Sequence, residues 1–237
     1  MWLLSNKVSV EDSGLLEGFC DHHCHLLPGV DDGVEELEET LQILKIWEQS
    51  GVSEVWMTPH IMEDYPNEPE KLKEVFLSVC HNFKGNIALH LAAENMMDGL
   101  FVKRLEENNL LTLGETEKRI LVETSYYIPP MNMEKLIDRI KKKGYDPILA
   151  HPERYQYMNK KDYLHWKQKG VLLQLNIPSL VGAYGLDVQR KAEWLLGQGM
   201  YDFCGTDTHS LNSVYNYLCS MINKKNVKRV LAFSNHS

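Results

Sequence analysis

Pairs of histidine and acidic residues at short spacings give this sequence its clearest chemical signal. His23 and His25 are two residues apart, and Asp207 and His209 repeat the spacing near the other end of the chain. Alternate residues of a strand face the same side, so each pair can present two side chains to one site. Imidazole and carboxylate ligands suit Zn, Mn or Fe, whereas thiolate-rich sites are typical of structural Zn. The two pairs therefore indicate a metal site.

Further histidines and acids follow other short apolar runs, which enlarges the set of candidate ligands. The set contains five histidines, two glutamates and two aspartates: His23, His25, Asp32, His60, Glu94, Glu123, His151, Asp207 and His209. One four-coordinate ion cannot use so many ligands, but two or three ions that share a bridging carboxylate can. A single His-x-His would be weak support. The agreement among several separate strands is what favours a site with two or three divalent ions.

The segments that must position these residues alternate between strand-like and helix-like patterns. Short apolar or β-branched runs, each followed by a turn or helix signal, predict strands over 19–25, 52–58, 87–94, 119–123, 147–150, 171–176 and 203–207. Apolar stripes at helical spacing, several of them closed by glycine, predict helices over 37–47, 71–83, 99–108, 133–140, 161–169, 188–196 and 211–225. This alternation predicts an α/β fold with parallel strands and helical crossovers.

The arrangement of the strands is either an open doubly wound sheet or a closed barrel. The loop after the first strand, residues 25–33, lacks the G-x-G-x-x-G turn of a dinucleotide-binding sheet. A closed barrel gathers all strand ends around one axis, where active sites of parallel barrels are built, whereas an open sheet spreads them along a line. The candidate ligands therefore favour a barrel.

Composition and charge exclude several classes of protein. The chain has 237 residues, 43% of them hydrophobic, and a net charge of −8, which is ordinary for a globular protein but unsuited to non-specific binding of nucleic acid or anionic membranes. No apolar run approaches the roughly 20 residues of a membrane span, and the start lacks the features of a signal peptide. We expect a polar surface extension over residues 1–18 and a single domain over 19–237.

The cysteines predict a cytoplasmic protein that does not use a thiol nucleophile. Their number, five, is odd, and no Cys-x-x-Cys pair occurs, which favours reduced thiols. A cysteine-based tyrosine phosphatase needs an arginine six positions after its cysteine. The residues at those positions are Leu26, Val30, Asn86, Ser210 and Lys225.

Arg154 lies three residues after a candidate ligand and could serve catalysis. Guanidinium binds phosphate in a planar, bidentate manner, and metal ions beside an arginine suit a transferring phosphoryl group. A surface ion pair with Glu153 is an equally good interpretation of the local sequence. Tyrosines near the same strand ends could frame an aromatic substrate ring or simply pack: Tyr65, Tyr126, Tyr127, Tyr155 and Tyr157.

With these motifs, the sequence resembles the PHP (polymerase and histidinol phosphatase) superfamily of metal-dependent phosphoesterases. Within it, the chain is most similar to the bacterial PHP-type protein-tyrosine phosphatases of capsule and exopolysaccharide loci. The resemblance begins near Phe19 and rests on these segments: DHHCH at 21–25, PGVDDG at 28–33, TPH at 58–60, AE at 93–94, LVE at 121–123, LAHPERY at 149–155 and TDTH at 206–209. It implies a distorted (β/α)7 TIM-like barrel with a trinuclear site.

The resemblance also implies a role for each candidate ligand. The implied groups are His23, His25, Glu94 and Asp207 for one ion; Glu94, Glu123 and His151 for a second; and Asp32, His60 and His209 for a third. Arg154 matches the phosphate-binding arginine of the family, and His209 is a candidate catalytic acid. Some relatives carry another arginine a few residues after the Asp-x-His motif, but residues 210–214 contain none, a departure that bears on substrate affinity.

The expected activity is hydrolysis of phosphotyrosine in protein, with Mn the first choice of metal and Fe or Zn as alternatives. A water held between the ions would lose a proton near neutral pH and attack phosphorus in line. The resemblance implies that the substrate is the tail of a bacterial tyrosine autokinase of polysaccharide export. Two alternatives are a small-molecule phosphatase of the histidinol-phosphate type, or a nuclease relative, and a non-catalytic regulatory domain that binds metal. The oligomeric state is left open.

Overall fold

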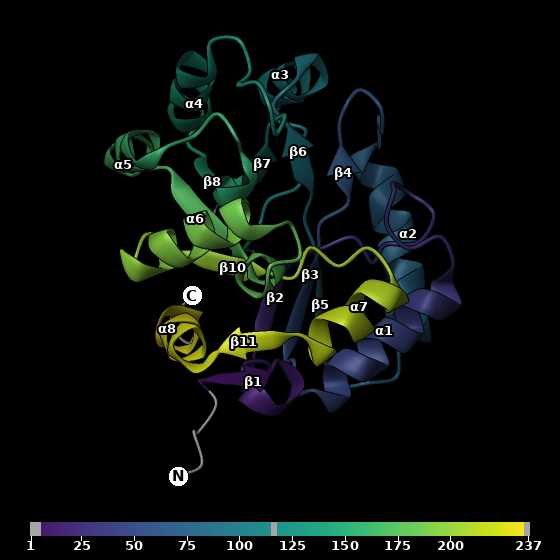
Figure 1. Cartoon of the computed structure of the whole chain (residues 1–237). Helices are drawn as coiled ribbons and strands as arrows, with labels where there is room; N and C mark the ends of the chain where they lie inside the picture. Colours follow the sequence, from purple (N-terminus) through teal and green to yellow (C-terminus); the bar gives the residue numbers. More distant parts are fainter. Residues whose placement is uncertain (1–5, 115–117, 235–237) are drawn as a thin grey trace.

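The computed structural model describes residues 6–114 and 118–234 and shows a mixed α/β fold built on parallel sheets (Figure 1). The larger sheet contains, in spatial order, β10 (Phe203–Gly205), β9 (Leu172–Asn176), β8 (Asp146–Ala150), β7 (Arg119–Glu123), β6 (Glu94–Met96) and β4 (His60–Ile61). The smaller contains β2 (Cys20–Cys24), β3 (Glu54–Met57) and β5 (Ala88–Leu91). All neighbouring strands within these two sheets are parallel.

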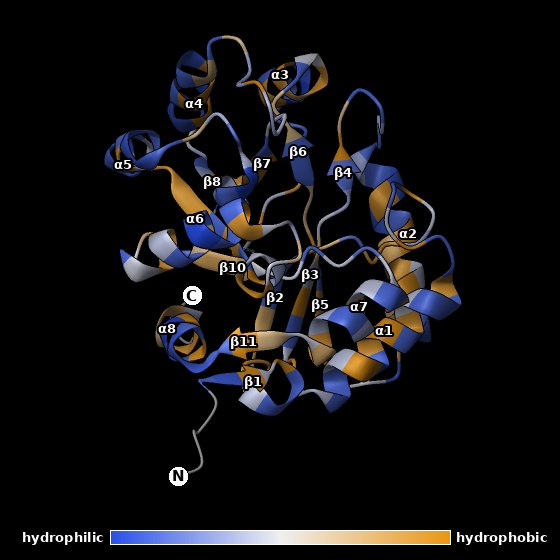
Figure 2. Cartoon of the chain, in the orientation of Figure 1, coloured by the Kyte–Doolittle hydropathy of each residue, from blue (hydrophilic) through white to orange (hydrophobic). Residues whose placement is uncertain are grey.

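Amphipathic helices connect the strands and cover them from outside. They are α1 (Leu37–Gln49), α2 (Pro69–Asn82), α3 (Gly99–Glu107), α4 (Met133–Lys142), α5 (Lys160–Gln168), α6 (Leu186–Gly197), α7 (Leu211–Cys219) and α8 (Lys224–Ser234). In α4, Met133, Leu136, Ile137 and Ile140 are buried, as their helical spacing predicts. Figure 2 shows the same division as alternating orange and blue along the helical ribbons. None of the helices within the described ranges combines the length and apolar character needed to cross a bilayer.

Two predicted strands end early, and each is followed after a short break by a second strand. The strand predicted over 87–94 ends as β5 at Leu91 and resumes as β6 at Glu94, and the strand predicted over 52–58 ends as β3 at Met57 and resumes as β4 at His60. Pro59 lies in the second break, where its missing N–H group removes one ladder donor. Each break passes the chain from the smaller sheet to the larger one, so both sheets are continued by the same chain segments.

The first and last parallel strands also lie side by side. Cys24 and Thr208 form an isolated parallel bridge, and His25 N–H donates to the Thr208 carbonyl at 2.9 Å. Asp207 N–H donates to the His23 carbonyl at 2.7 Å. These bonds place the end of β2 against the segment after β10, so the carboxyl ends of strands from both sheets meet.

The single helix predicted over 211–225 is wrong. Helix α7 ends at Cys219, and β11 (Met221–Asn223) then pairs antiparallel with β1 (Lys7–Ser9) before α8 begins (Figure 1). The expectation of a mere surface segment over 1–18 is also too simple, because Val10, Leu15 and Leu16 are buried. Strand pairing between the two ends of the chain is non-local, so helical spacing around residue 220 could not reveal it.

Candidate metal centre

The structure brings all nine predicted ligands into one cluster, at the carboxyl ends of parallel strands and at the two breaks where β4 and β6 begin. Their ligand atoms lie within 4.8 Å of one another in four overlapping groups: His25, Asp32, His60 and His209; His23, His25 and Asp207; His23, Glu94 and His151; and His60, Glu94 and Glu123. Glu123 is grouped with His60 and Glu94, and its Oε2 also lies 3.9 Å from His151 Nε2, the partner that the family pattern implies. Because single residues belong to several groups, the cluster has room for ions that share ligands.

Glu94, the first residue of β6, lies at the centre of the cluster. Its Oε1 accepts a hydrogen bond from His151 Nε2 at 2.9 Å. Its Oε2 lies 3.2 Å from His23 Nε2, 3.4 Å from His25 Nε2 and 3.2 Å from His60 Nδ1. A carboxylate that faces histidines with both oxygens has the geometry of a bridging ligand.

His60 and Glu123 provide an independent test of whether the cluster suits a metal ion. His60 Nδ1 and Glu123 Oε1 are both buried and lie 3.1 Å apart, yet neither has a hydrogen-bond partner among the described residues. Leaving buried polar atoms unpaired costs free energy. A divalent cation between an imidazole nitrogen and a carboxylate oxygen would satisfy both atoms, so the donors present fit a metal ion.

Two buried carboxylates of the cluster remain ionised. Burial alone would raise the pKa of Glu94, but His23 and His151 hold it well below its usual range. Burial likewise opposes ionisation of Asp207, and His23, His25 and Arg154 more than offset it, so the pKa of Asp207 is also lowered. Burial alone would lower the pKa values of His23 and His25, but Glu94 and Asp207 raise them, so the ionised carboxylates face charged imidazoles in this structure.

Backbone strain also occurs in this cluster. Among the described residues, four other than glycine have positive φ: Asn108, Asn132, His151 at 33° and Asp207 at 52°. Asparagine, aspartate and histidine adopt this region more often than other residues with a side chain, but it is uncommon even for them. His151 directly follows the end of β8 and Asp207 lies two residues after the end of β10, where the strained turn directs each side chain into the cluster. Strain of this kind tends to accumulate at functional sites.

Asp31 supports two of the histidines, and the sequence did not single it out. Its Oδ2 accepts from His25 Nδ1 at 2.8 Å and from the His60 backbone N–H at 2.9 Å, and its side chain is fully buried. Metal-binding histidines usually donate their second ring N–H to such a group, which fixes the ring orientation. Its position next to Asp32 is the only sequence signal for Asp31. The sequence cannot distinguish two adjacent aspartates in a loop, because their roles depend on which of them the fold buries.

Gln174 in β9 supports His23 in the same way. Its Oε1 lies 2.7 Å from His23 Nδ1, and its Nε2 donates to the His22 carbonyl at 3.2 Å. Asn176, two residues later on the same strand, donates to Asp207 Oδ2 at 2.9 Å. Strand β9 contributes none of the nine candidate ligands, yet it orients two of them.

The outer edge of the cluster is open to solvent. The Asp32 side chain is 53% exposed and that of His209 is 31% exposed. Asp32 Oδ1 lies 3.5 Å from His60 Nε2 and 3.6 Å from His209 Nε2. The interaction with His209, assisted by the nearby His60, lowers the pKa of Asp32 to about 2 in spite of partial burial. A substrate would approach the cluster from this edge.

Arg154 points into the cluster of candidate ligands. This geometry distinguishes the two interpretations of its sequence, a phosphate-binding arginine and a surface ion pair with Glu153. Its Nη1 donates to Asp207 Oδ2 at 2.6 Å, and the side chain is only 17% exposed. Glu153 instead accepts from the Asn176 backbone N–H and from the Tyr201 hydroxyl. Burial alone would lower the pKa of Arg154, but the Asp207 carboxylate raises it, so the guanidinium stays charged. The surface ion pair with Glu153 is therefore wrong.

Two tyrosine rings hold the guanidinium of Arg154. The guanidinium carbon lies 4.4 Å from the centre of the Tyr126 ring and 4.2 Å from that of Tyr184. Asn176 Nδ2 donates to the Tyr184 hydroxyl at 3.1 Å. The sequence indicated Tyr126 but missed Tyr184, which lies in a loop far from every motif. Tyr155, another indicated tyrosine, is fully buried and packs in the core.

The cysteines lie outside this chemistry. None belongs to a ligand group among the described residues. Cys24 lies between two of the histidines but turns away and donates to the Trp56 carbonyl at 3.4 Å. Burial raises the pKa values of the Cys20 and Cys204 thiols. These thiols are poor nucleophiles, because the thiolate is the reactive form.

Comparison with known families gives one family match over most of the chain. The model of the family described as "Capsular polysaccharide synthesis, CpsB/CapC" matches residues 19–231. Among curated proteins, the tyrosine-protein phosphatase YwqE of Bacillus subtilis (strain 168) is 29% identical over 199 residues, which are 81% of this chain and 78% of that protein. The tyrosine-protein phosphatase CpsB of Streptococcus pneumoniae is 26% identical over 204 residues, 81% of this chain and 84% of that protein.

A third relative and a solved structure extend this similarity. The putative tyrosine-protein phosphatase CapC of Staphylococcus aureus is 25% identical over 214 residues, covering 88% of this chain and 84% of that protein. The fold matches a crystal structure with a TM-score of 0.77 and 25% identity, over 90% of this chain and 85% of the other. That structure comes from work on YwqE of Bacillus subtilis and CpsB of Streptococcus pneumoniae, described as "unique metal-dependent tyrosine phosphatases".

Proposed function

The chain belongs to the CpsB/CapC family of capsular polysaccharide synthesis, and on this premise we propose that it is a metal-dependent tyrosine-protein phosphatase. The observation that carries the proposal is the single cluster of histidines and carboxylates with a charged arginine directed into it. Similarity to tyrosine-protein phosphatases over about four fifths of the chain supports the same activity.

The proposed architecture is a distorted (β/α)7 barrel formed by both sheets together. In this barrel, β3 and β4 together occupy one strand position, and β5 and β6 together occupy another. The parallel bridge between Cys24 and Thr208 is the proposed closure. The proposed boundaries are an extension over residues 1–18 and a single domain over 19–237, supported by a family match that begins at residue 19.

Two or three divalent ions are proposed at the centre, with Mn the first choice and Fe or Zn as alternatives. The proposed ligands are those the sequence indicated: His23, His25, Asp32, His60, Glu94, Glu123, His151, Asp207 and His209. When bound, such ions supply Lewis-acid stabilisation of phosphoryl oxygens and a water acidic enough to act near neutral pH. Glu94, which faces three histidines at 3.4 Å or less through one oxygen, is the proposed bridging ligand.

Protein groups bind and orient the phosphoryl group in this proposal. Arg154 donates to the phosphoryl oxygens from a guanidinium that Tyr126 and Tyr184 hold in plane. His209, at the solvent-exposed edge beside Asp32, is the candidate acid for the leaving group in a centre with two ions, where it binds none, because an imidazole nitrogen that binds an ion has no proton to give. A tyrosine phenolate has a conjugate-acid pKa near 10, so the reaction needs only modest help from that acid.

The proposed substrate is a phosphotyrosine in the tail of a tyrosine autokinase of polysaccharide export. Curated relatives named tyrosine-protein phosphatases support a phosphotyrosyl protein as substrate. The proposed location is the cytoplasm, where thiols stay reduced, and the five cysteines of the chain are all free.

The decisive experiment is steady-state hydrolysis of a phosphotyrosine peptide by the purified chain, with added Mn and with a chelator. Histidinol phosphate serves as the rival substrate. We expect metal-dependent turnover of the peptide and little turnover of histidinol phosphate. The reverse preference would assign the same centre to small-molecule metabolism. A chain that binds metal but hydrolyses neither substrate would be a regulatory domain.

A further inference from the structure

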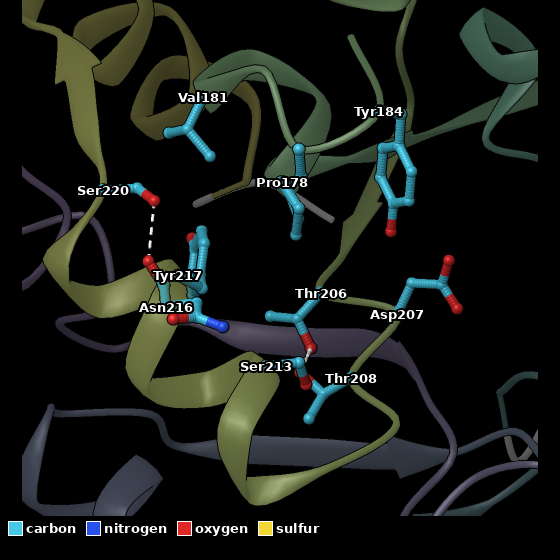
Figure 3. A pocket seen from close by; sticks show the side chains of 11 residues that line it. Pro178, Val181, Tyr184, Thr206, Asp207, Thr208, Ser213, Asn216, Tyr217 and Ser220 are labelled. Atoms are coloured by element: carbon cyan, nitrogen blue, oxygen red, sulfur yellow. Dashed lines mark hydrogen bonds between the residues drawn. The ribbon is translucent and has the colours of Figure 1, made fainter.

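A second cavity lies beside the metal centre, between the short helix η3 (Ile177–Val181) and helix α7. Its volume is about 390 Å³, which lies within the range of about 300–1,000 Å³ typical of ligand pockets. Figure 3 shows Val181 and Pro178 on one side, Asn216 and Tyr217 of α7 on another, and Tyr184 at one end. No residue or step of the proposed phosphatase reaction uses the space between η3 and α7.

Tyr184 separates this cavity from the phosphate-binding arginine. The side chain lines the cavity, and its ring centre also lies 4.2 Å from the guanidinium carbon of Arg154. Asp207, which accepts from Arg154, lines the same end of the cavity. The cavity therefore begins one side chain away from the place proposed for the phosphoryl group. The Cα atoms of adjacent residues are about 3.8 Å apart, so a neighbouring side chain can run alongside the phosphotyrosine and enter the cavity where the peptide backbone turns enough to direct both to one face.

The lining of the cavity defines the chemistry of its occupant. Pro178, Val181, Ala183 and the ring of Tyr217 are apolar, and no lysine or arginine lines the cavity. Asp207 is its single charged residue and is engaged by Arg154. A carboxylate or phosphate in this space would lack a cationic partner, and a lysine would be desolvated beside a carboxylate already paired, so the cavity selects an uncharged group.

The hydroxyls beside the cavity are buried or already engaged. Tyr217 is 5% exposed, and its hydroxyl is buried without a hydrogen-bond partner among the described residues. The hydroxyls of Thr206 and Thr208, which also line the cavity, are already engaged with each other at 2.7 Å. Because that hydroxyl has almost no accessible surface, an occupant of the cavity would meet the ring of Tyr217 and not its oxygen.

We propose that this cavity, which we call the flanking subsite, binds the uncharged side chain of a residue next to the phosphotyrosine of the substrate. The proposal rests on the proposed phosphatase function, because Arg154 must hold the phosphoryl group for the neighbouring residue to lie at the cavity. It makes Ala183, Asn216 and Tyr217 determinants of peptide specificity rather than of the reaction itself.

The test compares phosphotyrosine peptides that carry Tyr, Leu, Glu or Lys at the position before or after the phosphotyrosine. We expect kcat/KM to be about tenfold higher for Tyr or Leu than for Glu or Lys at one of the two positions, the scale on which apolar pockets discriminate. Equal rates for all four residues at both positions would overturn the proposal.

Filling the cavity provides the second arm of the test. Ala183 is exposed and lines the cavity, so Ala183→Phe should fill its mouth without disturbing the core. We expect this variant to lose the preference for Tyr and Leu while hydrolysis of p-nitrophenyl phosphate, which has no flanking residue, stays within about twofold. Ala232→Phe, an exposed alanine on α8, is the matched control and should keep the preference. An equal loss on both substrates, or no change in preference, would contradict the subsite.

Binding separates failure of the subsite from failure of the phosphatase. Calorimetry with peptides that carry a non-hydrolysable phosphonate in place of the phosphotyrosine measures the same preference without turnover. A preference for Tyr and Leu that Ala183→Phe removes would support the subsite even if the chain proved inactive. Absence of that preference in binding, together with metal-dependent turnover of p-nitrophenyl phosphate, would overturn the subsite and leave the phosphatase intact.

Discussion

The inner and outer parts of the metal centre differ in how their side chains are held. We call the buried residues His23, His25 and Glu94 the inner part; their side chains are at most 2% exposed and come from β2, from the residue directly after it, and from β6. Asp32 and His209 form the outer part, lie in loops and are 53% and 31% exposed. Strand positions fix geometry more tightly than loops do.

This difference suggests a division of labour. The inner part has hydrogen-bonded support from Asp31 and Gln174, which orients its imidazoles before any ion arrives. The outer part keeps space for substrate, as catalytic metal sites generally keep an open position. Damage to the inner part should therefore be more severe than damage to the outer part, and the following predictions test that ranking.

Removing the central carboxylate should have the largest effect. We expect Glu94→Gln to lower kcat/KM on a phosphotyrosine peptide by roughly 10³-fold or more, because stabilisation by bound metal is worth several kcal/mol and each 1.4 kcal/mol is tenfold. Glu74→Gln, at an exposed position on α2, is the control. Metal content measured on the same samples links the loss to the centre. Full activity of Glu94→Gln would refute a bridging role.

Arg154 should come second, since it acts on the substrate from beside the inner part. Arg154→Ala should lower kcat/KM by roughly 10²-fold, the scale of losing one preorganised donor to transferring charge. Arg154→Lys should recover only a small part, because lysine keeps the charge but lacks the planar fork that stacks between Tyr126 and Tyr184. Steady-state kinetics measure both variants. Equal activity of the lysine variant and the unaltered chain would argue against bidentate binding.

The adjacent aspartates give a direct comparison of the two parts. Asp31→Asn should weaken metal binding by about 10–100-fold, because it removes the acceptor that orients His25. Asp32→Asn, one residue later and half exposed, should weaken metal binding less than about tenfold, which is below that range. Titration of activity with Mn gives both values. If Asp32→Asn proved the more damaging, the ranking of inner over outer would be reversed.

Metal removal should lower stability more modestly than it lowers activity. A ligand present at 100 times its Kd stabilises the folded chain by about 2.7 kcal/mol. For a chain of this size that corresponds to a fall in Tm of roughly 5–10 °C on chelation. His209→Ala should keep most of this shift, whereas His23→Ala should lose most of it. Differential scanning fluorimetry with Mn and with a chelator makes the measurement, and equal shifts in the two variants would remove the distinction.

The cysteines should show the smallest effect, since they belong to neither part. Cys24→Ser keeps a donor for the Trp56 carbonyl, and Cys219 is exposed. We expect both Ser variants to keep kcat/KM within about twofold, because a protonated thiol contributes no nucleophile. Alkylation of the native chain should likewise leave turnover unchanged. Complete loss in either variant would revive a thiol mechanism.

The sequence by itself determined the chemistry of the site and most of the elements around it. Spacing identified His23 and His25 as neighbours on one strand face, and strand ends identified distant residues such as His151 as members of the same cluster. The strand over 119–123 and helix α4 follow from local patterns alone. These features are readable because they depend on residue type and on short periodicity.

Only the tertiary structure decided which neighbours support the site. Asp31 and Asp32 are chemically identical, and folding alone made one a buried acceptor and the other an exposed ligand candidate. Tyr184 meets Arg154 across a loop that no motif marks, and β1 pairs with β11 across almost the whole chain. Contacts between residues far apart in sequence depend on how the elements pack, and a local pattern contains no record of that packing.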